Sequence, residues 1–183
     1  MILDTLRIVS DWFADPTYGV AAMLAQVPLD GSDTRPAGVE IYDETRHADV
    51  AIGLLPVPAT AGHVVLAVNM ARDGVTVDGN AMPPIADGQV PIVIRIGRAS
   101  STPVTAVRDA LYVSRAAYWS LRRLMKNDAD AYAARTQRNG GTVAILTLAH
   151  LAITPFHVQL EDVQLVATWL AVLNVRDNTP FGP

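Results

Sequence analysis

A long amphipathic helix pattern in the middle of the chain separates two groups of strand-like segments. Ser100-Ser101-Thr102-Pro103 supplies the hydroxyl side chains and the proline that commonly begin a helix. Apolar residues then recur at spacings of three and four, which predicts one helix over residues 102–126 with one face packed on a core. The predicted core face consists of Val104, Val107, Leu111, Ser114, Tyr118, Leu121 and Met125.

Before this helix, the sequence predicts a first helix followed by short strands. Asp15-Pro16 should end the first helix, and residues 28–38 should form a surface loop after a short helical turn at 19–27. The first helix carries apolar residues at helical spacing, at Ile2, Leu6, Val9 and Phe13. Strands are predicted where apolar residues alternate, at Val39/Ile41, Val50/Ile52/Leu54, Val64/Leu66/Val68 and Ile92/Ile94/Ile96. Residues 75–87 are predicted to form either an extra hairpin or an ordered loop.

After the long helix, the chain ends in two strands that are apolar on both faces. Both alternating sets of residues are apolar over 142–154 and 163–175, a pattern typical of strands covered on both sides. We expect the helices to cover one side and a neighbouring subunit to cover the other. Residues 1–183 should form a single α+β domain in the order helix, strands, helix, two strands. The sheet should be antiparallel or mixed, with both helices on one face and an extended tail at 176–183.

The composition favours a protein that assembles. Half of the residues are apolar and only 17% are charged, whereas roughly a quarter are charged in a typical soluble domain. These few charges leave apolar surface that we expect another subunit to cover, the alternative being an unusually buried monomer. Residues 50–71 and 139–160 lack charged side chains, but their proline, glycine, valine and threonine favour buried strands over membrane spans.

Positive charge is concentrated on one flank of the long helix. Arg108, Arg115 and Arg122 recur every seven residues and Lys126 continues the row, so they form one stripe along the helix. Residues 95–138 hold nine of the fourteen basic residues and three acids, a local charge of +6 in a chain of net charge −4. The first 94 residues carry −8. Unlike patches of this kind fit a head-to-tail ring, in which the basic patch of one copy meets the acidic patch of the next.

The basic residues are expected to face either a neighbouring subunit or a channel, and simple solvation of a helix flank is the alternative. Arginine suits bidentate contacts with carboxylates. A subunit interface is favoured, because a channel in which DNA slides gains little from tight phosphate contacts. The candidate interface or lumen residues are Arg95, Arg98, Arg108, Arg115, Arg122, Arg123, Lys126 and Phe181.

No catalytic or metal-binding motif accompanies this charge. The chain has no cysteine, which excludes disulfides and thiolate sites, and its histidines form no H-x-H or H-E-x-x-H pair. We therefore expect no catalytic residue, cofactor or metal. The competing hypothesis is a small α+β enzyme or ligand-binding domain whose site is assembled from distant positions. Its candidate residues are Asp43, His47, His150, His157 and one of the arginines. A nonspecific nucleic-acid binder is a third, weaker reading.

The start of the chain and the order of its elements resemble one known family. An amphipathic helix leads into Ala14-Asp15-Pro16-Thr17-Tyr18-Gly19-Val20, and a small helix and a proline-containing loop precede the first strand. This opening, and the layout of helix, strands, long helix and two strands, is similar to tail terminator (tail-completion) proteins of long-tailed bacteriophages.

The resemblance implies a structural α+β subunit that forms a ring, hexameric in this family, on the end of the tail tube. Such a ring stops growth of the tube, docks to the head connector and neck proteins, and lets DNA pass through its lumen without specific binding. The protein would lie in the virion after assembly in the host cytoplasm, with no role for a membrane, a cofactor or catalysis. The loops at 28–38 and 73–90 are longer than in many members of this family. A different neck component, such as a head-closure protein, is therefore the alternative.

Overall fold

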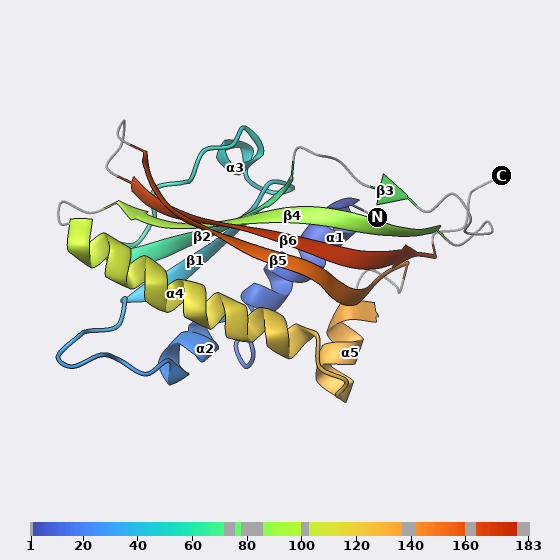
Figure 1. Cartoon of the computed structure of the whole chain (residues 1–183), viewed down its shortest axis with the longest axis horizontal. Helices are drawn as coiled ribbons and strands as arrows, with labels where there is room; N and C mark the ends of the chain where they lie inside the picture. Colours follow the sequence, from blue (N-terminus) through green and yellow to red (C-terminus); the bar gives the residue numbers. More distant parts are fainter. Residues whose placement is uncertain are drawn as a thin grey trace.

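The computed structural model describes residues 2–71, 76–77, 86–99, 103–136, 142–159 and 164–178. In this part of the chain, one twisted β-sheet lies against a layer of helices (Figure 1). The predicted α+β class and the order helix, strands, long helix, two strands are confirmed.

The sheet is mixed, with the strand order β1-β2-β4-β6-β5. β1 (Gly38–Asp43) runs parallel to β2 (His63–Met70), and the later pairings along this order are antiparallel. The two-residue β3 (Thr76–Val77) pairs with Gly88 and Gln89 of β4. Of the two structures predicted for residues 75–87, an extra hairpin or an ordered loop, this pairing favours the hairpin. The three longest strands are β4 (Ala86–Ala99), β5 (Val143–Gln159) and β6 (Gln164–Asp177).

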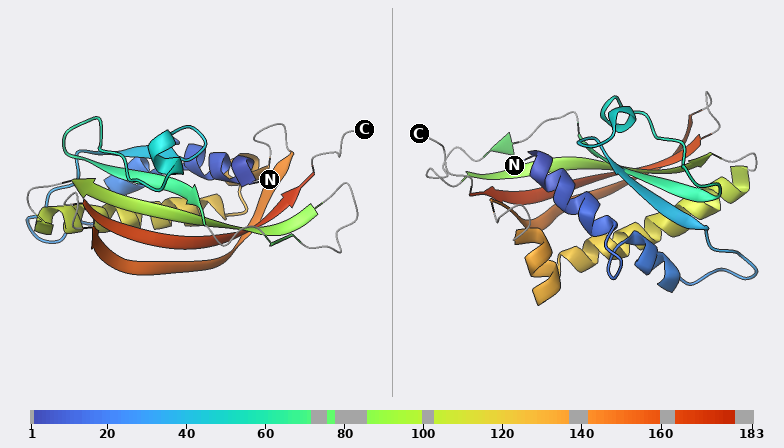
Figure 2. Two further views of the ribbon diagram at one scale, coloured as in Figure 1. Left: turned by 90° about the horizontal axis from the view of Figure 1, so that it is seen from above. Right: turned by 180° about the vertical axis from the view of Figure 1, so that it is seen from behind.

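Four helices share one core with one face of the sheet (Figures 1 and 2). Ile92, Ile94 and Ile96 of β4 alternate toward this side, and Trp169 of β6 lies edge-to-face with Tyr118 at 6.4 Å between ring centroids. The helices are α1 (Ile2–Phe13), α2 (Val20–Gln26), α4 (Pro103–Leu124) and α5 (Ala129–Thr136). Both the N-terminal helix and the long helix therefore pack on the same face, as predicted.

The strand predicted at Val50/Ile52/Leu54 is wrong. Residues Ala48–Ala51 form the short helix α3, and an irregular segment follows it on the other side of the sheet. Val50 and Leu55 are buried against Val65 and Ala67 of β2, while Ile52 and Leu54 point outward. The alternation of apolar residues was real, but Gly53 has a φ of 91°, which turns the backbone out of an extended conformation.

The core face predicted for the long helix is only partly right. Ser114 and Leu121 are buried, and Tyr118 and Met125 pack against the core, but Val104 and Leu111 are 77% and 51% exposed. Most of the buried apolar residues of α4 are small. They are Ala106, Ala110, Tyr112, Val113, Ala116, Ala117, Leu121 and Leu124. The predicted face was based on the large apolar side chains at helical spacing. It was misplaced because alanine gives only a weak hydrophobic signal in a sequence.

The two closing strands are confirmed and are longer than predicted, because β6 continues to Asp177. Most of the extended tail predicted at 176–183, from residue 179 on, lies outside the described residues. Arg176 and Asp177 belong to β6, where they pair with Asp87 and Ala86 of β4. β5 is an edge strand with register shifts, the first of which lies between Ile145 and Thr147. In the described part of the chain, no helix has both the length and the apolar character needed to cross a membrane.

The turn between α1 and α2 explains the segment Ala14–Val20 singled out in the sequence. The Asp15 carboxylate accepts hydrogen bonds from the backbone N–H groups of Thr17 (2.8 Å) and Tyr18 (2.9 Å). The Gly19 N–H donates to the Asp15 carbonyl at 2.8 Å, and a Cβ at position 19 would collide with the carbonyl oxygens of Phe13 and Asp15. Only glycine fits there, because backbone atoms of Phe13 and Asp15 occupy the space that a Cβ would need.

Replacing Gly19 with alanine should therefore destabilise the protein strongly. We expect G19A to lower the free energy of unfolding by about 3 kcal/mol, since backbone atoms must move to admit a methyl group. G31A is the matched control: Gly31 has a φ of 56° but open space around it, so the cost there should be about 1 kcal/mol. Urea unfolding followed by tryptophan fluorescence measures both. Equal losses would show that the turn adapts without strain.

Candidate functional site

The basic stripe of α4 divides into an internally paired end and an exposed end. Arg108 lies 3.5 Å from Asp33 and 3.2 Å from Asp109, both measured to the carboxylate oxygen. Tyr112 also donates to Asp33, at 2.8 Å. Arg108 thus ties α4 to the 28–38 loop of its own subunit, which leaves it little capacity to pair with a neighbour.

Arg115 and Arg122 are exposed and lie over aromatic rings. The Arg115 guanidinium carbon is 5.3 Å from the centroid of Trp119, and that of Arg122 is 5.7 Å from the centroid of Tyr118. Within the described residues, neither has a carboxylate partner. Stacking on a ring holds a guanidinium in place while leaving its N–H edge available for an anion. These two arginines are therefore the best-presented cations of the stripe.

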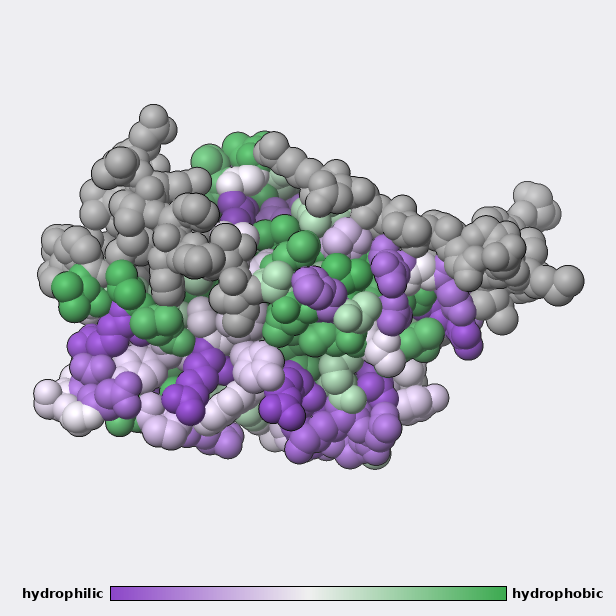
Figure 3. Space-filling view, in the orientation of Figure 1, coloured by the Kyte–Doolittle hydropathy of each residue, from purple (hydrophilic) through white to green (hydrophobic). Residues whose placement is uncertain are grey.

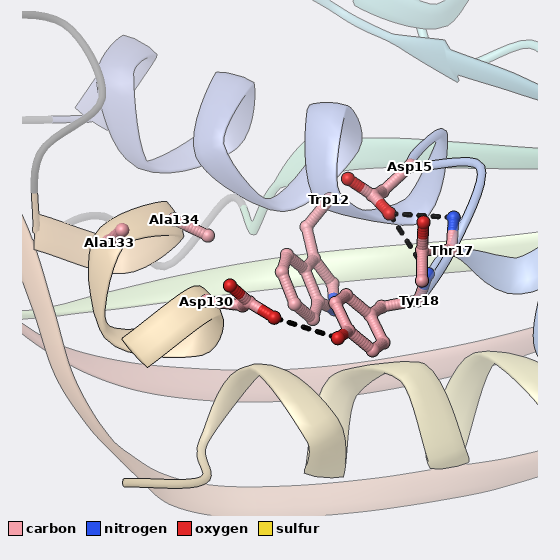
Figure 4. A pocket seen from close by; sticks show the side chains of 7 residues that line it. All are labelled: Trp12, Asp15, Thr17, Tyr18, Asp130, Ala133 and Ala134. Atoms are coloured by element: carbon pink, nitrogen blue, oxygen red, sulfur yellow. Dashed lines mark hydrogen bonds between the residues drawn. The ribbon is translucent and has the colours of Figure 1, made fainter. Parts of the chain in front are cut away.

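Tyr18 connects this surface to the turn after α1 (Figure 4). Its ring stacks on Trp12 at 5.5 Å between centroids, and its hydroxyl donates to Asp130 at 2.7 Å. The Arg123 guanidinium lies 4.4 Å from the same ring and forms an ion pair with Asp128. These contacts join α1, α4 and α5, and Trp12, Tyr18 and Asp130 line an open hollow of about 530 Å³. The carboxylates beside the hollow, Asp15 and Asp130, already accept hydrogen bonds within the subunit, so their role here is structural.

A larger groove, of about 810 Å³, lies on the other side of Tyr18. We name it the α4 groove. Its walls combine apolar side chains with exposed cations, a mixture that suits a segment that is partly apolar and partly acidic. The residues that define the α4 groove are Tyr18, Met23, Trp119, Arg122, Met125 and Lys126.

Arg95 lies on the opposite face of the sheet from the stripe. Its guanidinium donates to the carbonyl oxygens of Gly53 and Leu54 and, at 2.8 Å, to the side-chain oxygen of Asn69. Burial lowers the pKa of Arg95 and the nearby Glu44 carboxylate raises it, with burial the larger effect. Arg95 therefore supports a loop within its own subunit. The side chain of Arg98 and all of Phe181 lie outside the described residues.

Several carboxylates of the acidic N-terminal part are used inside the subunit. Asp11 pairs with Arg46 at 2.6 Å, and Asp15 holds the α1–α2 turn. Asp43 is 2% exposed and accepts hydrogen bonds from Ser10 (2.9 Å) and from the Thr45 hydroxyl (2.6 Å). The sequence charge of −8 therefore overstates the acidic surface that is available to another copy.

The structure brings together only some residues of the competing enzyme hypothesis, because Asp43 lies next to His47 and pairs with one arginine, Arg46, at 3.3 Å, while His150 lies elsewhere. Asp43 and His47 are neighbours, with the His47 Nδ1 atom 3.1 Å from the Asp43 carbonyl oxygen. His150 lies on β5, at the opposite edge of the sheet from β1, and the side chain of His157 is outside the described part. Among the described residues, no group of three or more histidine or carboxylate side chains is arranged to hold a metal.

The chain matches no protein-family model and no curated protein.

Protonation of the buried Asp43 should couple stability to acid. Burial raises its pKa, but hydrogen bonds from Thr45 and Ser10 and the charge of Arg46 outweigh this effect, and the pKa lies below its usual value. A carboxyl with a lowered folded-state pKa stabilises the fold above the unfolded pKa of about 3.9. That stabilisation is lost as pH falls through the folded pKa. D43N should cost about 2 kcal/mol at pH 7 and flatten the loss of stability below pH 4 seen in urea titrations. D49N, which changes an exposed carboxylate, is the control. If D43N and the wild type lose stability in acid to the same extent, Asp43 is not the group that couples stability to pH.

Proposed function

We propose that this protein is a structural subunit of a homo-oligomeric ring in the neck or tail of a long-tailed bacteriophage. The ring would cap the tail tube and join it to the head connector, and DNA would pass through the lumen without specific binding. In this role the protein would lie in the virion. The order of elements carries the proposal: an N-terminal helix, a mixed sheet, one long helix and two closing strands form a single α+β layer structure.

The surface of α4 supports association with another protein. Arg115 and Arg122 are exposed along one side of α4 and are held by aromatic rings, and Lys126 is exposed two residues after the helix ends at Leu124. Aromatic and arginine side chains are the types enriched at protein interfaces. A partner with carboxylates at matching positions would form charge-assisted hydrogen bonds with them.

The second face of the closing strands also supports association. Leu170 and Val172 of β6 point away from the helices and are half-buried, and their register partners include Val93 and Pro91 of β4. At one end of this apolar area, Arg176 holds Asp87 through two contacts of 2.7 and 2.9 Å. Figure 3 shows hydrophobic side chains gathered over the middle of this strand region. A neighbouring subunit that covers this area would remove the apolar surface from water.

The purified protein should form a ring or a concentration-dependent oligomer. Apolar and charged surfaces of the kind described above gain free energy when they meet a second copy. Sedimentation velocity and images of single particles measure the mass and the closure of the assembly. Addition of the protein to isolated tail tubes should cap their ends. A strictly monomeric protein at high concentration that also fails to associate with tubes would rule the proposal out.

Reversing the charge of Arg115 and Arg122 should weaken assembly. In the proposed ring these side chains meet carboxylates of a neighbour, so R115E/R122E should raise the dissociation concentration by at least about tenfold, and added salt should narrow the difference. R7E, which reverses an exposed arginine of α1, serves as the control. Unchanged assembly together with defective tail joining or DNA passage would place the two arginines in the lumen.

A further inference from the structure

An apolar loop projects from the protein on the side opposite the α4 groove. Ile52, Leu54 and Val57 are 70%, 55% and 71% exposed, although they lie within six residues of one another. We name these three residues the apolar loop. Figure 3 shows hydrophobic side chains at the top of the molecule, over the α3 region that begins this segment. Exposed apolar residues scattered singly are common, whereas a cluster on one projecting segment marks a contact surface.

The apolar loop is held in a defined shape at its beginning. Arg95 donates to the carbonyl oxygens of Gly53 and Leu54, and the Asn69 side-chain amide donates to the Val50 carbonyl at 2.6 Å. Between the exposed residues, Leu55 is buried in the small cluster on this face of the sheet. Such anchoring reduces the conformational entropy that a docking loop loses on binding.

A second clamp holds the segment at its far end. The Glu40 carboxylate accepts hydrogen bonds from the backbone N–H groups of Ala59 and Thr60, both at 2.8 Å, and from the Tyr42 hydroxyl at 2.7 Å. Burial raises the pKa of Glu40, but these donors and the nearby His63 lower it to about 2. The carboxylate is therefore ionised throughout the physiological range. The fold thus supports the outward position of the apolar loop from both ends.

The α4 groove offers a complementary surface. Met23, Trp119 and Met125 form its apolar walls, and methionine adapts its shape to an inserted side chain. Arg122 and Lys126 lie exposed at the groove. Asp49 is exposed just before the apolar loop, and Glu44, which accepts a hydrogen bond from Asn69 at 3.3 Å, lines a hollow together with Ile52. The apolar loop with its neighbouring acids on one side of the subunit is therefore complementary to the apolar walls and cations of the α4 groove on the other side.

We propose that the apolar loop of one copy docks in the α4 groove of a second copy. In Figures 1 and 2 the α3 region lies above the sheet, while α2 and the C-terminal half of α4 lie below it. The apolar loop and the α4 groove of one subunit therefore cannot contact each other. A contact between unlike, opposite surfaces is head-to-tail, and repetition of such a contact closes a ring when its rotation permits. The inference rests on the proposed ring and names the contact that builds it.

Two variants with complementary defects test this contact. I52S/V57S replaces the two most exposed residues of the apolar loop, and R122D/K126D reverses the charge of the α4 groove. All four substituted side chains are exposed, so folding should be retained. Each variant alone should need at least about a 100-fold higher concentration to assemble than the wild-type protein. L3S/V104S, which changes two exposed apolar residues elsewhere, should assemble like the wild type.

Mixing the two variants gives the decisive result. The first variant keeps an intact α4 groove and the second keeps an intact apolar loop, so the mixture should form 1:1 dimers at concentrations where each variant alone is monomeric. Sedimentation velocity reads the mass. The proposed contact is overturned if I52S/V57S assembles like the wild type. It is also overturned if both variants fail to assemble and no dimers form on mixing. Neither result contradicts the proposed ring itself. A wild-type protein that is monomeric at every concentration removes the ring itself.

Discussion

The contact between α1 and α4 determines where the rest of the helical layer lies. The Trp12 indole N–H donates to the Ser120 carbonyl at 2.9 Å, and the Ser120 hydroxyl donates to the Tyr18 carbonyl at 2.8 Å. All of these groups are buried or partly buried, where an unpaired polar group is costly, so the pairing resists displacement. Tyr18 belongs to the turn before α2 and lines the α4 groove, and Arg123 lies over its ring, so this contact holds one wall of the groove in place.

The charged residues that the sequence groups together have different partners in the fold. Arg108 and Arg95 support loops of their own subunit, and Arg123 is paired with Asp128, whereas Arg115 and Arg122 rest on aromatic rings with their N–H edges presented to the outside. Internal pairing consumes donors and acceptors that a simple count of charges treats as available. The surface that remains for a partner is smaller than the net charges suggest, and it is better defined, because its cations are positioned by the rings beneath them.

Sequence reasoning found the cations and missed the apolar loop. The spacing of Arg115 and Arg122 placed both on one flank of a helix, since helical geometry alone determines that relation. Ile52 and Leu54 were interpreted as strand residues because they alternate with Ala51 and Gly53. The available signals against a strand were Gly53, Pro56 and Pro58, which disfavour regular pairing. The partners that hold the loop, Arg95 and Asn69, come from distant strands, and no local pattern connects them to it.

The amino-acid sequence by itself determined the class of fold, the order of the elements and the composition of the charged helix, because these depend on local spacing and on the amount of apolar surface. Tertiary structure decided which face of α4 is buried: close packing favoured the row containing Ala106, Ala110 and Ala117 over the larger Val104 and Leu111. It also decided which charges are paired within the subunit and where the apolar loop and the α4 groove lie. Those outcomes depend on contacts between residues far apart in the chain, and contact geometry of that kind is absent from any local pattern.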